Sequence, residues 1–312
     1  MRRPVLAALT AASLAAPAAA QLAFNELLID PGGLDTGRQV VELVNTTSGS
    51  FTPTGWQLCA PFTYAPLPSF AVPRGGIVRI FIGKSGIDTP TQWFMPLMRT
   101  LLHADTLLLY KSMNFNNSAD IIDFVGWGGG SGRIGQAVSV GQWPSISATV
   151  PQPPVDHTIA WIGTGDAPAA WYRDGTPTLG SANGHGAVSV LGSGCPTSKG
   201  PALLLAPSPA VDGNIDFLLA VSGAPPSAGV VFLIGVQPAG GVPVLGCPIE
   251  ALPVASVARG ASVAGVATLP LSHYVPGLSL SGSVLFYQAL VADPSASNGL
   301  FGASWGLRVV VG

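Results

Sequence analysis

Hydrophobic and polar residues alternate in short runs along most of the chain. In GGIVRIFIG, residues 75–83, Val78, Ile80 and Ile82 share one face and Arg79 lies on the other. Such alternation with a period of two is typical of half-buried strands, and turn residues such as PGG, TSGS and NFNNS separate the runs. The pattern predicts strands over residues 22–30, 39–45, 55–59, 76–83, 106–111 and 120–127.

The later part of the chain divides into a Gly/Ser/Pro-rich insert and a second series of apolar runs. Residues 128–155 predict a long surface loop, with an extra hairpin as an open alternative. Runs such as IDFLLAVSG, GVVFLIGVQ and SVLFYQALVAD then follow, and no amphipathic helix of convincing length is found. The sequence therefore predicts an all-β fold with two β-sandwich domains, residues 21–186 and 187–312.

The first twenty residues have the composition of a secretory signal peptide. Arg2 and Arg3 precede an uncharged Ala/Leu-rich run that ends in Ala18, Ala19 and Ala20. This run is shorter and less bulky than the roughly 20 apolar residues of a spanning helix, which is the competing interpretation. We expect residues 1–20 to be removed and the chain to be secreted, periplasmic or on the cell surface.

Charged residues are scarce, at 9% of the chain. Without Arg2 and Arg3, the 13 basic residues fall to 11 against 15 acidic ones, a net charge of −4. A chain of this charge without a Lys/Arg cluster does not attract phosphates, so we expect no nucleic-acid partner. We also expect no membrane span after signal cleavage, because no later run is long and apolar enough.

Three cysteines leave one without a partner. Cys195 and Cys247 both stand in Gly-Cys-Pro in the second domain, whereas Cys59 is alone in the first. We predict a Cys195–Cys247 disulfide, and we expect Cys59 to be a small buried hydrophobic residue.

Acidic residues give the only hint of a metal ion. Calcium prefers carboxylate and carbonyl oxygens, and the weak candidates are Asp30, Asp35, Glu42, Asp120 and Asp123. The alternative is that these acids solvate a strand face. For Glu42, the alternation predicts the less buried face of a strand or a strand edge. No other cofactor is expected.

The sequence contains no other motif of a catalytic or cofactor site whose surrounding residues support that function. GSGRIG, residues 130–135, matches a dinucleotide-binding pattern, but the following QAVSVGQWPS shows no helical period. Zinc is unsupported, because the four histidines are dozens of residues apart. No G-x-S-x-G elbow is present to hold a nucleophilic serine. We therefore predict no catalytic residues.

Tryptophans beside Gly or Pro provide candidate binding surfaces in the first domain. Trp56, Trp127 and Trp143 could stack on sugars or anchor a protein partner if their rings are exposed. Core packing is the alternative for each of them.

Residues 22 to about 184 resemble a bacterial lamin tail domain. The resemblance rests on LAFNELLID, QVVELVNTTSG, GWQL, FAVPRGGIVRIFIG, DTLLLY, DIIDFVGWGG and TPTLGSAN, in this order. It implies an immunoglobulin-like sandwich that serves as a non-catalytic interaction module, and it carries over no catalytic residues. The insert near 128–155 and Cys59 depart from the family pattern. The segment from GSGCP to the end is similar to C-terminal β-modules of exported proteins from environmental bacteria.

The sequence thus predicts an exported binding or structural protein rather than an enzyme. Its partner is expected to be a protein or a cell-surface glycan. A carbohydrate-binding module and a secreted hydrolase remain the alternatives, and the hydrolase would need a polar cluster with perturbed pKa values in a cleft.

Overall fold

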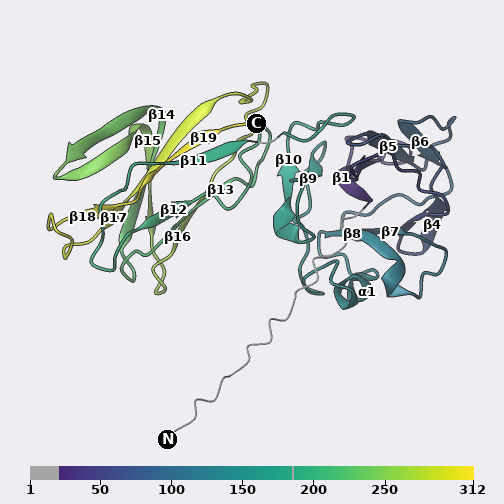
Figure 1. Ribbon diagram of the computed structural model, residues 1–312, viewed down its shortest axis with the longest axis horizontal. Coiled ribbons are helices and arrows are strands. Elements are labelled where there is room, and N and C mark those ends of the chain that lie inside the picture. The colour runs from purple at the N-terminus through teal and green to yellow at the C-terminus, as the bar shows by residue number, and fades with distance from the viewer. Residues whose placement is uncertain (1–20, 185) are drawn as a thin grey trace, which may run out of the picture.

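The computed structural model describes residues 21–184 and 186–312, and the predicted signal peptide, residues 1–20, lies outside them. Two groups of strands follow one another along the chain (Figure 1). The fold is all-β, as the alternation predicts, and the only α-helix in the described residues has six residues. No helix in this part of the chain is long and apolar enough to cross a bilayer.

The first group of strands forms a six-stranded sheet and a four-stranded sheet. The order in the six-stranded sheet is β10-β9-β1-β2-β5-β6, and only the β5–β6 pair is parallel. The order in the four-stranded sheet is β4-β3-β7-β8. The strands are β1 (Leu22–Leu28), β2 (Val40–Asn45), β3 (Gln57–Ala60), β4 (Thr63–Pro66), β5 (Ile77–Ile82), β6 (Gln92–Met95), β7 (Asp105–Tyr110), β8 (Ile121–Trp127), β9 (Thr158–Trp161) and β10 (Trp171–Asp174).

A single apolar core joins these two sheets. Leu27, Val41 and Ile80 lie in one row across β1, β2 and β5, and all three are buried in this core. Leu58 of β3 and Phe124 of β8 belong to the same cluster. Full burial of such a side chain stabilises the fold by roughly 1.5–3 kcal/mol, so the apolar rows hold the sandwich together.

All six strands predicted from alternation are present, and β4, β6, β9 and β10 lie outside the six predicted ranges. Each of these four has four residues, which is too short for a period to stand out. The insert contains no hairpin but a helix, α1 (Ile134–Ser139), so the expectation that no helix follows GSGRIG is wrong. Ile134 and Ala137 are buried, and this packing stabilises a turn of helix that local propensity does not predict.

The second group of strands also forms two sheets. The larger has the order β11-β19-β17-β14-β15, with β18 beside β17, and the smaller has the order β12-β13-β16. Phe217, Phe232 and Val309 are among the residues buried between them. The strands are β11 (Ala187–Leu191), β12 (Leu203–Leu205), β13 (Leu218–Ser222), β14 (Gly229–Val244), β15 (Cys247–Gly260), β16 (Ala267–Pro270), β17 (Val284–Ala292), β18 (Phe301–Ala303) and β19 (Gly306–Val310).

The tip of the long β14–β15 hairpin is fixed by a disulfide and a buried glutamine. Cys247 at the start of β15 is joined to Cys195, which confirms the predicted pair, whereas Cys59 is free and buried. Gln288 of β17 accepts a hydrogen bond from the Glu250 amide at 2.8 Å and donates one to the Pro248 carbonyl at 3.0 Å. The tip of the β14–β15 hairpin is therefore bound to the rest of its sheet by covalent and polar contacts.

Strand β10 connects the two groups of strands. The Arg173 side chain pairs with Asp216, and its Nε donates to Asp216 Oδ2 at 2.8 Å. The Ile215 amide donates to the Arg173 carbonyl at 3.1 Å, and the Gly175 amide donates to the Gly213 carbonyl at 2.9 Å. Residues 213–216 thus bond to the backbone at the end of β10.

Removing the disulfide tests its contribution. The double variant Cys195→Ala/Cys247→Ala opens a loop whose ends are 52 residues apart, which lowers the free energy of unfolding by about 4 kcal/mol on the chain-entropy model. Urea unfolding of the variant measures this loss, and the reduced wild-type protein is the matched control. Equal unfolding midpoints for the oxidised wild type and the variant would contradict the prediction.

Candidate functional site

A row of polar residues crosses the six-stranded sheet on the face opposite the apolar core. Arg79, Glu42 and Glu26 are direct partners on β5, β2 and β1, and Glu26 continues through Ala160 of β9 to Tyr172 of β10. Directly paired residues lie on the same face of a sheet. The row therefore places two carboxylates side by side. The adjacent row, which contains Leu27 and Val41, points to the opposite face of the sheet and into the core.

Glu42 is fully buried, with 0% of its surface exposed, so its expected place on a less buried face or at a strand edge is wrong. β2 lies between β1 and β5 and is not an edge. Gly180, in the chain segment that follows β10, donates its amide to Glu42 Oε1, and Asn25 Nδ2 donates to Oε2 at 3.1 Å. Burial raises the pKa of Glu42 to about 7, and these two hydrogen bonds partly oppose the rise.

Glu26 is held by threonines in the same way. Thr158 Oγ1 donates to Glu26 Oε1 at 2.6 Å, and the Thr178 amide donates to the same oxygen at 3.0 Å. Thr178 Oγ1 donates to Oε2 at 2.8 Å. Burial raises the pKa of Glu26 as well, while these bonds lower it. The two glutamates together bind residues 178–180 over this face of the sheet.

Asp123 of β8 is a third buried carboxylate, and it connects the two sheets. Its Oδ2 accepts the Phe24 amide of β1 at 2.6 Å, and its Oδ1 accepts the Phe124 amide at 2.7 Å. β9 pairs with β1 only from Glu26 to Leu28, so the Phe24 amide lies beyond that pairing. Burial raises the pKa of Asp123 to about 7. Asp123 thus replaces a missing strand partner.

Asp120 is likewise held by hydrogen bonds and an ion pair. It accepts hydrogen bonds from Ser112 Oγ and from Asn117 Nδ2, and Lys111 Nζ lies 3.4 Å from its Oδ1. The structure does not bring Glu42, Asp120 and Asp123 together with the other calcium candidates, and each of the three has its own separate set of hydrogen-bond donors.

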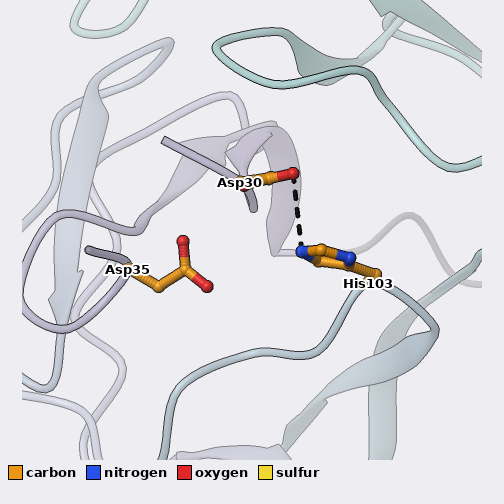
Figure 2. A group of neighbouring side chains, drawn as sticks. All are labelled: Asp30, Asp35 and His103. Atoms are coloured by element: carbon orange, nitrogen blue, oxygen red, sulfur yellow. Dashed lines mark ion pairs between the residues drawn. The ribbon is translucent and has the colours of Figure 1, made fainter. Parts of the chain in front are cut away.

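Asp30 and Asp35 do come together, and His103 joins them (Figure 2). The two aspartates belong to the loop between β1 and β2, and His103 belongs to the loop between β6 and β7. One ligand atom from each residue lies within 4.8 Å of the others, and His103 Nε2 is 3.4 Å from Asp30 Oδ2. This trio is the one group of metal-ligating side chains that converges in the described residues.

The donor set of the trio differs from what calcium requires. Calcium takes roughly six to eight oxygen ligands, whereas the trio offers two carboxylates and an imidazole nitrogen. An imidazole with two carboxylates is better matched to zinc or manganese. The trio is half-exposed, and acidic groups of this kind are common on protein surfaces without an ion.

The three candidate tryptophans are buried, so their rings are not available as a binding platform. Trp127 Nε1 donates to the Leu102 carbonyl at 2.9 Å, and Trp143 packs edge to face on Phe124 with ring centres 5.0 Å apart. Trp56 is packed against a phenylalanine ring at the same distance. Core packing, the alternative considered for each ring, is what the structure shows.

The described residues also line a pocket of about 590 Å³ at one end of the first group of strands. Arg99 and Asp105 form an ion pair in its lining, with Arg99 Nη2 2.7 Å from Asp105 Oδ2. The remaining lining is mostly apolar. Its residues are Pro61, Phe62, Arg99, Thr100, Leu102, Ala104, Asp105, Ser131 and Gly132.

Phe62, at the rim of this pocket, is an unusual residue for its position. It is 100% exposed and has a φ of 69°, in the turn between β3 and β4. A turn with proline at its first central position and positive φ at its second usually has Gly or Asn there. A bulky side chain in this conformation costs roughly 1–2 kcal/mol, and its exposed ring recovers nothing from core packing.

Aromatic residues continue from Phe62 along β4. Tyr64 is 54% exposed and its ring centre lies 4.7 Å from that of Phe115. The Arg133 guanidinium stands 5.6 Å from the centre of the Phe115 ring. Phe62 lies at the tip of the β3–β4 hairpin. We therefore call Phe62, Tyr64 and the pocket lining together the hairpin-tip surface.

A comparison with models of known protein families finds no match for the chain, and a comparison with curated proteins finds none either. The geometry of the site itself is therefore the basis for a functional proposal.

The hairpin-tip surface contains no tryptophan, so the candidate tryptophans did not predict it. CAPFTYAP, residues 59–66, does contain a usable signal: two short alternating runs around Pro61-Phe62, with no glycine at the turn. His103 was missed as a partner of Asp30 because the two residues are far apart in the chain.

Buried glutamate makes the stability of the fold depend on pH. The folded-state pKa of Glu42, about 7, lies above its ordinary 4.5, so the folded state binds this proton more tightly. The contribution of this proton to the free energy of unfolding is complete below pH 4.5 and is lost as the pH rises through 7. The free energy of unfolding falls by roughly 3 kcal/mol at most over this range. Urea unfolding from pH 5 to pH 8 should show this decline, with a shallower slope for Glu42→Gln.

Asp123→Asn provides the contrast. It also makes the slope shallower, but it lowers stability at every pH, because an amide offers one acceptor oxygen to the two backbone amides. An unchanged pH slope in Glu42→Gln would contradict this account.

Calcium should have little effect on the trio. We expect millimolar calcium to leave the melting temperature of the protein unchanged, because two carboxylates and an imidazole do not form its oxygen shell. Calorimetric titration and thermal unfolding measure this directly, with Asp30→Asn/Asp35→Asn as the control. A calcium-dependent rise that the control abolishes would refute the prediction.

Proposed function

We propose that this chain is an exported, non-catalytic interaction protein that binds its partner through the hairpin-tip surface. The observation that carries the proposal is Phe62, a fully exposed aromatic ring held in a strained backbone conformation beside an apolar pocket. Strained residues cluster at functional sites, and aromatic rings are frequent binding hot spots.

The placement of the perturbed acids supports a non-catalytic role. A hydrolase needs titratable groups in a cleft that substrate can enter. Glu26, Glu42 and Asp123 are instead buried and bonded to backbone amides or neighbouring side chains. The ionisable groups of the pocket, Arg99 and Asp105, form an ion pair with each other. Both sets of groups therefore have structural partners.

The character of the surface favours a protein partner over a glycan. Sugar binding needs free polar side chains around the stacking ring. The lining of the Phe62 pocket is mostly apolar, and its two charged residues, Arg99 and Asp105, are paired with each other. Export and interaction are also what the lamin-tail resemblance and the composition of residues 1–20 imply. An extracellular or cell-envelope protein is therefore the proposed partner class.

Replacing Phe62 separates binding from stability. Phe62→Gly should raise the free energy of unfolding by on the order of 0.5–1 kcal/mol, because relief of the strained φ exceeds the entropy cost of glycine. The same variant should lose the proteins that the mature wild type captures from its own cell-envelope and secreted fractions. Urea unfolding and a quantitative pull-down measure the two effects.

Phe62→Ala is the matched control, because it removes the ring but keeps the positive φ. It should lose capture without gaining stability. Full capture by Phe62→Gly would refute the proposal, and ring-dependent binding on a glycan array would favour the carbohydrate-binding alternative.

A further inference from the structure

The hairpin-tip surface carries a projecting ring and a hollow side by side. Phe62 is fully exposed and so does not fill the pocket that it helps to line. Pro61, the residue before it, forms the adjacent wall. The ring and the space that could receive a ring are therefore neighbours on one face of the molecule.

We propose that the occupant of this pocket is Phe62 of a second copy of the chain, in a two-fold symmetric dimer. This inference rests on the proposed role of the hairpin-tip surface as a binding surface, and it names a second copy of the chain as the occupant of the pocket. In a two-fold interface the same patch serves both copies, so it must be complementary to itself. A projection beside a hollow satisfies this condition, because one rotation places each ring in the other pocket.

The charge of the surface permits two identical copies to approach. Arg99 and Asp105 neutralise each other at 2.7 Å, so the pocket presents no net charge to its own copy. An acidic or basic pocket would instead repel an identical surface. The mature chain as a whole carries a net charge of only −4, from 11 basic and 15 acidic residues once Arg2 and Arg3 are removed.

Arg99 also provides a specific contact for an incoming ring. Its Nε, Nη1 and Nη2 donate to Pro61, Thr100 and Asp105, which uses three of the five N–H groups of a guanidinium. These bonds hold the guanidinium plane in the pocket lining. A fixed guanidinium is suited to stack on an aromatic face by a cation–π contact.

The size of the contact predicts a weak dimer. Two buried phenylalanines remove roughly 300–500 Å² from water, well below the roughly 1,200 Å² of a stable interface. Leu102, which lines the pocket and is 57% exposed, adds to the surface around them. We therefore expect reversible association at micromolar or higher concentrations rather than a permanent dimer.

Sedimentation equilibrium of the mature chain tests the proposal. From about 1 to 300 µM, the wild type should shift from monomer towards dimer mass, and Phe62→Ala should remain a monomer throughout. A wild type that stays monomeric, or a Phe62→Ala variant that dimerises equally, would overturn the inference.

Photo-crosslinking locates the contact. Phe62→p-benzoylphenylalanine, irradiated in an equal mixture of isotope-labelled and unlabelled chains, should give mixed-label crosslinks to residues 99–105 or 131–132. Mixed-label crosslinks confined to any other surface would overturn the proposal.

The two proposals fail in different ways. If the chain stays monomeric while Phe62→Gly still loses its envelope partners, the dimer is refuted and the proposed function stands. If Phe62→Ala abolishes dimerisation while capture of other proteins is unaffected by Phe62→Gly, the dimer stands and the proposed envelope partner is refuted.

Discussion

The first group of strands depends on two buried glutamates that face each other across β1 and β2. Their sheet is covered on both sides: by apolar residues on one face, and on the other by the chain that leaves β10. Burying two carboxylates side by side is costly unless donors reach them. Thr158, Thr178 and Gly180 supply those donors, so the segment after β10 is fixed where it crosses Glu26 and Glu42.

This constraint also determines which parts of the molecule remain for function. Glu26 and Glu42 hold the covering segment, and Asp123 completes the hydrogen bonding of β1. At the connection to the second group of strands, Arg173 and Asp216 are likewise bonded to each other. The acids that are most perturbed thus maintain the framework, and the exposed chemistry lies at loop ends: the Asp30–Asp35–His103 trio and the hairpin-tip surface.

Alternation predicted the all-β fold and the six main strands of the first group because one face of each strand must enter a core. It failed where burial comes from a distant segment. Glu42 was expected on the more exposed face of its strand. That face is buried because residues 178–180 pack over it. The tryptophans were candidate binding rings, yet they fill the core, and α1 forms because Ile134 and Ala137 pack into the fold. His103 meets Asp30 through tertiary contacts that no local pattern contains.

Phe62 is the more exposed of the two large apolar residues with positive φ in the described part of the chain, the other being Leu245. Arg133 donates a hydrogen bond to the Phe115 carbonyl, and its guanidinium lies over the Phe115 ring. Asp156 accepts a hydrogen bond from the Gly32 amide. Both residues therefore make contacts within the fold that offset the cost of their positive φ. Leu245 is 60% exposed in the tip of the β14–β15 hairpin. Phe62 is wholly exposed, and glycine would fit its turn with less strain. A ring that opposes the stability of its own turn, next to a mostly apolar pocket, is the observation on which the proposed contact outside the monomer rests.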